Sequence, residues 1–112
     1  MIQNTKYKGV FSRDLAAQSV PVAYTQIISN APFSANFAEI FYTGTAPLRL
    51  GTGATGNESE EVIIFPSGTN GTIQYVPIQF SIGTNLYLRA YTIPGGTPAA
   101  VSTGTLYINF LG

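Results

Sequence analysis

The residues of this chain that could do chemistry are few, and two of the usual agents of catalysis are missing. The sequence contains no histidine and no cysteine. Histidine is the commonest general base and metal ligand, and the cysteine thiolate is the nucleophile and metal ligand of many other sites. Only carboxylates remain for acid–base work. We therefore expect a protein that is not an enzyme and that holds no metal and no cofactor.

The most unusual segment is rich in glycine and in acids. Gly51, Gly53 and Gly56 have the Gly-x-Gly-x-x-Gly spacing of a dinucleotide-binding loop. That loop must open a helix within a βαβ unit, whereas these glycines lead into three carboxylates and then into a predicted strand at 61–65. Clustered acids also repel phosphate, and no Walker lysine is present. A nucleotide site is not expected here.

The three acids of this segment, Glu58, Glu60 and Glu61, allow two interpretations. Oxygen-rich loops can hold calcium, although this spacing is not that of an EF-hand. Alternatively the segment is a solvated turn that keeps an otherwise uncharged surface soluble, and we favour this interpretation. Adjacent loop acids give no reason to expect the two separated carboxylates of a glycosidase.

One arginine stands between aromatic residues within a strand pattern. Arg89 lies two residues from both Tyr87 and Tyr91. In a strand the three side chains therefore share one face, and they are candidate interface residues. The guanidinium could cover an aromatic ring, or it could form an ion pair with Glu39 or with an acid of segment 58–61. Zero net charge and scattered cations give no electrostatic footprint for nucleic acid.

The elements that would position these residues are short strands. Segments 76–82 and 86–93 alternate apolar and polar residues, and Gly83-Thr84-Asn85 between them suits a tight turn, so we predict an antiparallel hairpin as the spine of the fold. Further strands are predicted near 19–28, 37–43, 48–50, 61–65 and 103–111. Residues 1–112 should therefore form one all-β domain, an antiparallel β-sandwich or jelly roll of roughly eight strands.

The N-terminal segment, residues 1–18, carries four of the ten formal charges. It is either an edge strand or an extended arm that docks on a neighbouring subunit. In the second case Tyr7, Val10 and Phe11 would be its anchors.

The composition favours a subunit of a larger assembly. Charged residues make up only 9% of the chain, against about 25% in ordinary globular proteins, and 12% are aromatic. Such a weakly charged surface gives little protection against association. No signal peptide and no apolar run of membrane-spanning length is evident, so synthesis in a cytoplasm without membrane insertion is expected.

The chain resembles small phage virion proteins at residues 48–58, 63–64 and 77–90. In those proteins a Gly-Ala-Ala-Gly-Ser-Glu-like turn precedes a strand, and a Pro-Ile-x-Ile-x-x-Gly-Thr-x-Leu-x-x-Arg hairpin follows. The matching residues here are 53–58 and 77–89. The resemblance implies a head decoration, or capsid cement, protein that binds the major capsid protein on the virion surface as a homo-oligomer, with a trimer favoured. A tail or fibre component, or a glycan-binding β-sandwich module, remains the alternative.

Overall fold

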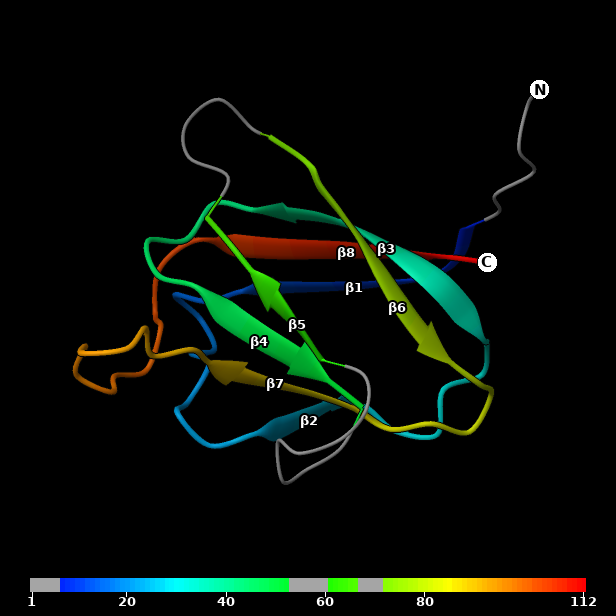
Figure 1. Cartoon of the computed structure of the whole chain (residues 1–112), viewed down its shortest axis with the longest axis horizontal. Helices are drawn as coiled ribbons and strands as arrows, with labels where there is room; N and C mark the ends of the chain where they lie inside the picture. Colours follow the sequence, from blue (N-terminus) through cyan, green and yellow to red (C-terminus); the bar gives the residue numbers. More distant parts are fainter. Residues whose placement is uncertain (1–6, 53–60, 67–71) are drawn as a thin grey trace.

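The computed structural model describes residues 7–52, 61–66 and 72–112, and within them the chain forms eight strands and no helix (Figure 1). Two four-stranded antiparallel sheets pack face to face as a β-sandwich, as predicted. The first sheet has the strand order β1 (Tyr7–Asp14), β8 (Thr105–Leu111), β3 (Ala35–Tyr42), β6 (Gln74–Phe80). The second has the order β2 (Thr25–Ile28), β7 (Leu86–Ala90), β4 (Leu48–Gly51), β5 (Glu61–Ile64). No membrane-spanning helix occurs in the described ranges.

The strands pair in a nested pattern. β1 pairs with β8, β2 with β7, β3 with β6, and β4 with β5, as though one long hairpin had been rolled up. Rolling brings β3 against β8 and β4 against β7, which completes the two sheets. This is the strand order of a jelly roll. Its β4–β5 pair is the tip of the rolled hairpin.

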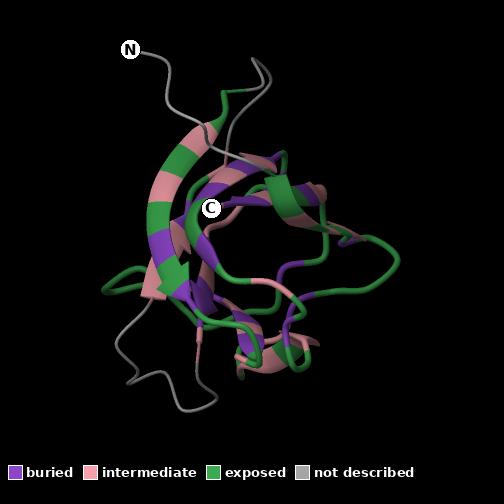
Figure 2. Cartoon of the chain, turned by 90° about the vertical axis from the view of Figure 1, so that its right-hand side faces the viewer, coloured by how far each residue is buried: buried purple, intermediate pink, exposed green. Residues whose placement is uncertain are grey.

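The core follows from the period-two alternation of the strands. In β7, Leu86, Leu88 and Ala90 are buried while the residues between them are partly exposed, and β8 buries Leu106, Ile108 and Phe110 in the same way. Figure 2 shows buried and exposed bands alternating along the strands. Because each sheet has one apolar face, two sheets must bury those faces against each other.

The predicted hairpin of 76–82 with 86–93 is wrong. β6 ends at Phe80 in the first sheet, and β7 begins in the second, so residues 81–85 cross between sheets. Gly83 does adopt the turn conformation, with φ of 94°, but its backbone N–H donates to the carbonyl of Ala31 in the β2–β3 connection. The alternation of segment 76–82 places Ile82 on the apolar face with Ile78 and Phe80, but Ile82 is 69% exposed because the strand has already ended.

The N-terminal segment is a strand of the domain from Tyr7 onward and is not a separate arm there. β1 is an edge strand paired with β8, and Phe11 packs against the core. Tyr7 and Val10 are exposed. The first six residues of the expected arm lie outside the described residues.

One end of the sandwich is closed by a tight approach of two connections. Tyr42, fully buried, donates its phenolic O–H to the carbonyl of Ala46 at 2.6 Å. Gly104, with φ of 93°, lies directly against the backbone of Gly44, so that a Cβ at Gly104 would overlap it. Only glycine adopts this positive φ without strain and also fits against the backbone of Gly44.

Candidate functional site

Aromatic side chains gather on the outer surface of the first sheet. The backbone register places Val10, Asn109, Glu39 and Tyr75 in one row across its four strands. The two neighbouring rows add Tyr7 and Phe37 on one side and Tyr107 and Phe41 on the other. We call this surface the aromatic face and define it by the residues Tyr7, Val10, Phe37, Phe41, Tyr75 and Tyr107.

The rings of this face support one another. Phe37 and Tyr75 stack with centroids 5.6 Å apart, and Phe41 lies 6.3 Å from Tyr107. Tyr75 is 54% exposed and Phe37 38%. These contacts hold large apolar side chains in fixed positions at the surface. Because the side chains are already ordered, covering them with a partner would cost little side-chain conformational entropy.

Glu39 lies in the middle of the aromatic face and is hydrogen-bonded within the chain. Its Oε1 accepts the Tyr7 hydroxyl at 3.3 Å and Nδ2 of Asn109 at 3.2 Å. The negative charge of Glu39 raises the pKa of Tyr7. A carboxylate that already accepts two hydrogen bonds is less costly to cover than a bare one.

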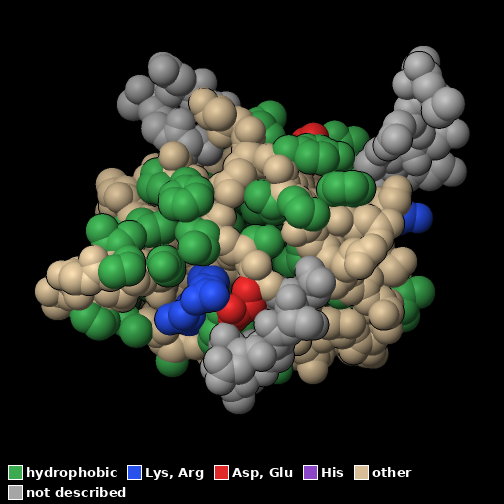
Figure 3. Space-filling model, viewed as in Figure 1, with side chains coloured by type: hydrophobic (Ala, Val, Ile, Leu, Met, Phe, Trp, Pro, Cys, Tyr) green, Lys and Arg blue, Asp and Glu red, His purple; other side chains and the backbone are tan. Residues whose placement is uncertain are grey.

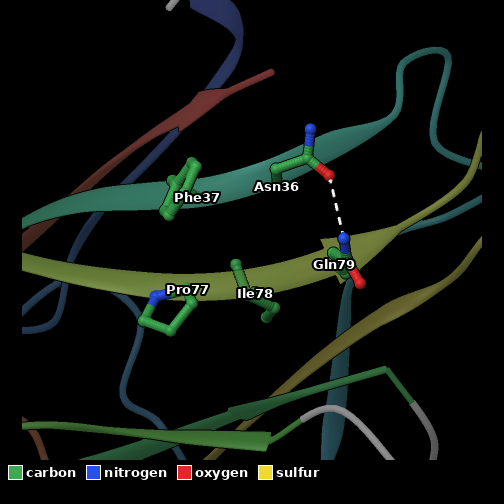
Figure 4. A pocket seen from close by; sticks show the side chains of 5 residues that line it. All are labelled: Asn36, Phe37, Pro77, Ile78 and Gln79. Atoms are coloured by element: carbon green, nitrogen blue, oxygen red, sulfur yellow. Dashed lines mark hydrogen bonds between the residues drawn. The ribbon is translucent and has the colours of Figure 1, made fainter.

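A shallow hollow of about 500 Å3 opens beside Phe37 at the β3–β6 bulge. Asn36, Pro77, Ile78 and Gln79 also line it (Figure 4). Nε2 of Gln79 donates to Oδ1 of Asn36 at 3.3 Å. Amide groups beside an aromatic ring are the kind of arrangement that can hold a sugar, through hydrogen bonds to hydroxyls and contact with the apolar ring face.

The outer surface of the second sheet carries a different group, which we call the arginine cluster: Tyr24, Arg49, Glu61, Arg89 and Tyr91. Arg49 and Arg89 are direct cross-strand neighbours on β4 and β7. Arg49 Nη2 forms an ion pair with Oε2 of Glu61 at 2.6 Å. Figure 3 shows the basic and acidic side chains side by side over β4 and β7, bordered by hydrophobic side chains.

Each arginine of the cluster lies over a tyrosine ring. Arg89 is 5.0 Å from the Tyr24 centroid, and Arg49 is 5.6 Å from that of Tyr91. Tyr24 also donates its hydroxyl to Oε1 of Glu61. Burial raises the pKa of Tyr24, the hydrogen bond to Glu61 raises it further, and the positive charge of Arg89 beside the hydroxyl opposes the rise.

The structure corrects the expected partners of Arg89. Its ring partner is Tyr24, which precedes β2, and neither Tyr87 of its own strand nor Tyr91, which follows that strand. Glu61 pairs with Arg49 instead of Arg89. Glu39 belongs to the outer surface of the other sheet, so it cannot reach Arg89.

The glycine- and acid-rich segment connects two antiparallel strands of one sheet, β4 and β5. This connection is not a βαβ unit, which removes the structural context of a dinucleotide loop. Gly53, Gly56, Glu58 and Glu60 lie outside the described residues. Among the described residues, no three His, Cys, Asp or Glu side chains gather where they could hold a metal ion.

Most residues of the two surfaces were not among the sequence-based interface candidates. For Phe37 and Phe41 the sequence did hold a sign of exposure. They share one face of β3 with Glu39, and an unpaired carboxylate must face the solvent. Tyr24 had no such signal, and Glu61 was expected only as one of several acids that could pair with Arg89, since the pairing of β2 with β7 and of β4 with β5 decides where they meet.

Comparison with known proteins adds no relative: no protein-family model matches the chain, and no curated protein or solved structure matches it.

Proposed function

We propose that this protein is a non-enzymatic phage head decoration subunit that attaches to the capsid lattice through its aromatic face. The observation that carries the proposal is that face itself, a sheet surface of fixed, exposed rings with one internally hydrogen-bonded carboxylate. The motif resemblance supplies the phage context. The jelly-roll strand order is compatible with it, since viral capsid domains use this architecture, as do lectins.

The size of the face suggests how it is used. One aromatic side chain has roughly 150–250 Å2 of surface that can be buried. With the exposed fractions of these residues, the aromatic face exposes about 500 Å2 of side-chain area. A stable interface buries about 800 Å2 on each partner, so one such face provides modest affinity. A homotrimer would present three of them to a repeating lattice, and avidity would then hold the subunit in place.

Attachment would act mechanically. Burial contributes about 25 cal/mol per Å2 before the cost of association, and many repeated contacts would brace the shell against internal pressure. The protein would be made in the host cytoplasm and would function on the outer surface of the virion, bound to the major capsid protein.

The test is to measure binding of the purified protein to heads stripped of it. The variant Phe37→Ser/Tyr75→Ser removes the stacked pair, and Ile82→Ser/Ile93→Ser is the matched control because both isoleucines are exposed outside the aromatic face. We expect at least a 10-fold loss of bound copies for the first variant and wild-type binding for the control. Equal binding of all three proteins would refute the aromatic face as the attachment surface.

Two further measurements address the assembly. Light scattering at high concentration should give a trimer, and a stable monomer would contradict the avidity argument. Particles from the source phage should carry hundreds of copies. A handful of copies would instead indicate a tail or fibre component.

Glycan binding is the second candidate function, favoured by the hollow beside Phe37 with its two amide side chains, Asn36 and Gln79. A glycan array probed with the wild-type protein tests it. Hits that disappear in Gln79→Ala would support this function, and an array without hits would remove it.

A further inference from the structure

The backbone register forces two positive charges together on the second sheet. Leu48 and Leu50 of β4 and Leu88 of β7 are fully buried, so alternation turns Arg49 and Arg89 to the outer surface. The two arginines are directly opposite each other in the β4–β7 ladder. Like charges at directly opposite positions destabilise a sheet unless something neutralises them.

The described residues neutralise only one of these charges. Glu61 is ion-paired to Arg49 and accepts a hydrogen bond from Tyr24. Arg89 has no carboxylate partner among the described side chains and lies over the Tyr24 ring. Two guanidinium groups and one carboxylate leave the cluster with one positive charge in excess.

The excess charge is partly removed from water. Nε of Arg49 and Nε of Arg89 are both inaccessible to solvent and have no hydrogen-bond partner among the described residues. The Arg49 side chain is 30% exposed, so the cluster is open on its outer side. A guanidinium that has lost part of its hydration shell interacts more strongly with an anion than one fully in water.

Gly51 shapes the space next to the arginines. It lies between Tyr87 and Glu61 in the row across β7, β4 and β5. A Cβ at this position would contact Cγ of Glu61 at 3.3 Å and the Tyr24 hydroxyl at 3.5 Å. The absent side chain therefore leaves room for Glu61 and the Tyr24 hydroxyl to meet beside Arg49.

From these observations we infer that the arginine cluster is a binding site for one carboxylate group, held by Arg89 and Arg49. A planar carboxylate matches the guanidinium fork and can accept two parallel hydrogen bonds. A single negative charge balances the single excess charge. A phosphate dianion fits less well, because Glu61 already places a negative charge beside Arg49.

This inference does not depend on attachment through the aromatic face, because the cluster occupies the opposite sheet. The carboxylate could belong to an acidic side chain of a protein or to an acidic sugar, and both present the same group. The carboxylate site on the second sheet is therefore separate from the proposed attachment surface on the first sheet.

The test uses the Nε–H signals of the arginines in NMR titrations of the full chain at constant ionic strength. The probes are acetate, a short peptide containing one glutamate, and glucuronate, with chloride as the reference anion. We expect saturable shifts of the Arg49 and Arg89 signals with the carboxylates and none with chloride. Tighter binding of the peptide than of acetate would indicate a protein source, and tighter binding of glucuronate an acidic sugar.

Three variants make the result specific. Arg89→Met should weaken carboxylate binding at least 10-fold, and Arg89→Lys should weaken it less because it keeps the charge but loses the fork. Arg13→Met is the matched control, since Arg13 also lies over a ring, Phe11, at 5.5 Å, but belongs to the first sheet. Circular dichroism of each variant checks folding.

Several outcomes would overturn the inference. These are an absence of saturable shifts in the wild type, equal shifts with chloride, or equal weakening by Arg13→Met. Glu58 and Glu60 lie outside the described residues, so the variant Glu58→Gln/Glu60→Gln is titrated as well. Binding that occurs only in that variant would mean that the chain's own acids fill the site.

Discussion

The ion pair between Glu61 and Arg49 allows a quantitative test of the arginine cluster. Replacing Glu61 by Gln keeps the shape of the side chain and removes its charge. The change breaks the 2.6 Å ion pair and weakens the acceptor of the Tyr24 hydroxyl. It also leaves Arg49 and Arg89 facing each other with no described carboxylate paired to either.

The expected loss of stability follows from the burial of the pair. Exposed pairs contribute up to about 1 kcal/mol, and breaking a buried pair costs about 3–5 kcal/mol. The side chains of Arg49 and Glu61 are 30% and 11% exposed, so we place the ion pair at about 2 kcal/mol. Weakening the charge-assisted hydrogen bond from Tyr24 adds roughly 1 kcal/mol. Glu61→Gln should therefore lower the free energy of unfolding by about 2–3 kcal/mol.

Urea denaturation of the wild type, Glu61→Gln, Arg49→Met and the double variant measures this loss and the coupling between the two residues. We expect a coupling energy of about 1–2 kcal/mol, since the residues are in direct contact. Glu39→Gln is the control: Glu39 accepts hydrogen bonds from Tyr7 and Asn109 and has no ion pair among the described residues, so its loss should be below about 1 kcal/mol. A loss under 1 kcal/mol for Glu61→Gln, or a coupling energy of zero, would refute the geometry of the cluster.

Four further predictions concern the fold. Tyr42→Phe should lower the free energy of unfolding by about 1–2 kcal/mol in urea titrations, because it leaves the partly buried carbonyl of Ala46 without its 2.6 Å donor. Burial raises the pKa of Tyr42 to about 12, against about 10 in the unfolded chain. The stability contributed by the neutral phenol should therefore be fully present below about pH 10 and lost as the pH rises through about 12. Alkaline unfolding followed by circular dichroism measures this loss. Ile78→Ala should cost about 2–5 kcal/mol and Ile82→Ala less than about 0.5 kcal/mol in the same urea assay, whereas similar losses would restore the hairpin prediction. Gly104→Ala should cost roughly 2–4 kcal/mol, from positive φ and overlap with Gly44, and a thermal midpoint unchanged from the wild type would contradict that close approach.

Local pattern was sufficient for the fold class and for the approximate places of most strands, but not for their ends, since the strands predicted at 19–28 and 86–93 are β2, Thr25–Ile28, and β7, Leu86–Ala90. Alternation in 86–90 and 105–111 identifies which side chains enter the core, because successive side chains of a strand must point to opposite faces. The turn at Gly83 was also predictable, since glycine readily adopts the positive φ found there. The absence of histidine and cysteine is likewise a property of the sequence alone.

The partners of each strand could not be obtained in this way. The turn residues at 83–85 are compatible both with a hairpin and with a connection that crosses between sheets. Only the packing of the two complete sheets determines that the chain crosses. The arginine cluster depends on the same choice. Tyr24, Arg49, Glu61 and Arg89 come from four segments of the chain, and they meet because rolling the nested pairs places β2, β7, β4 and β5 side by side. Periodicity is a property of a single strand, whereas a site shared by several separate segments is a property of the sheet.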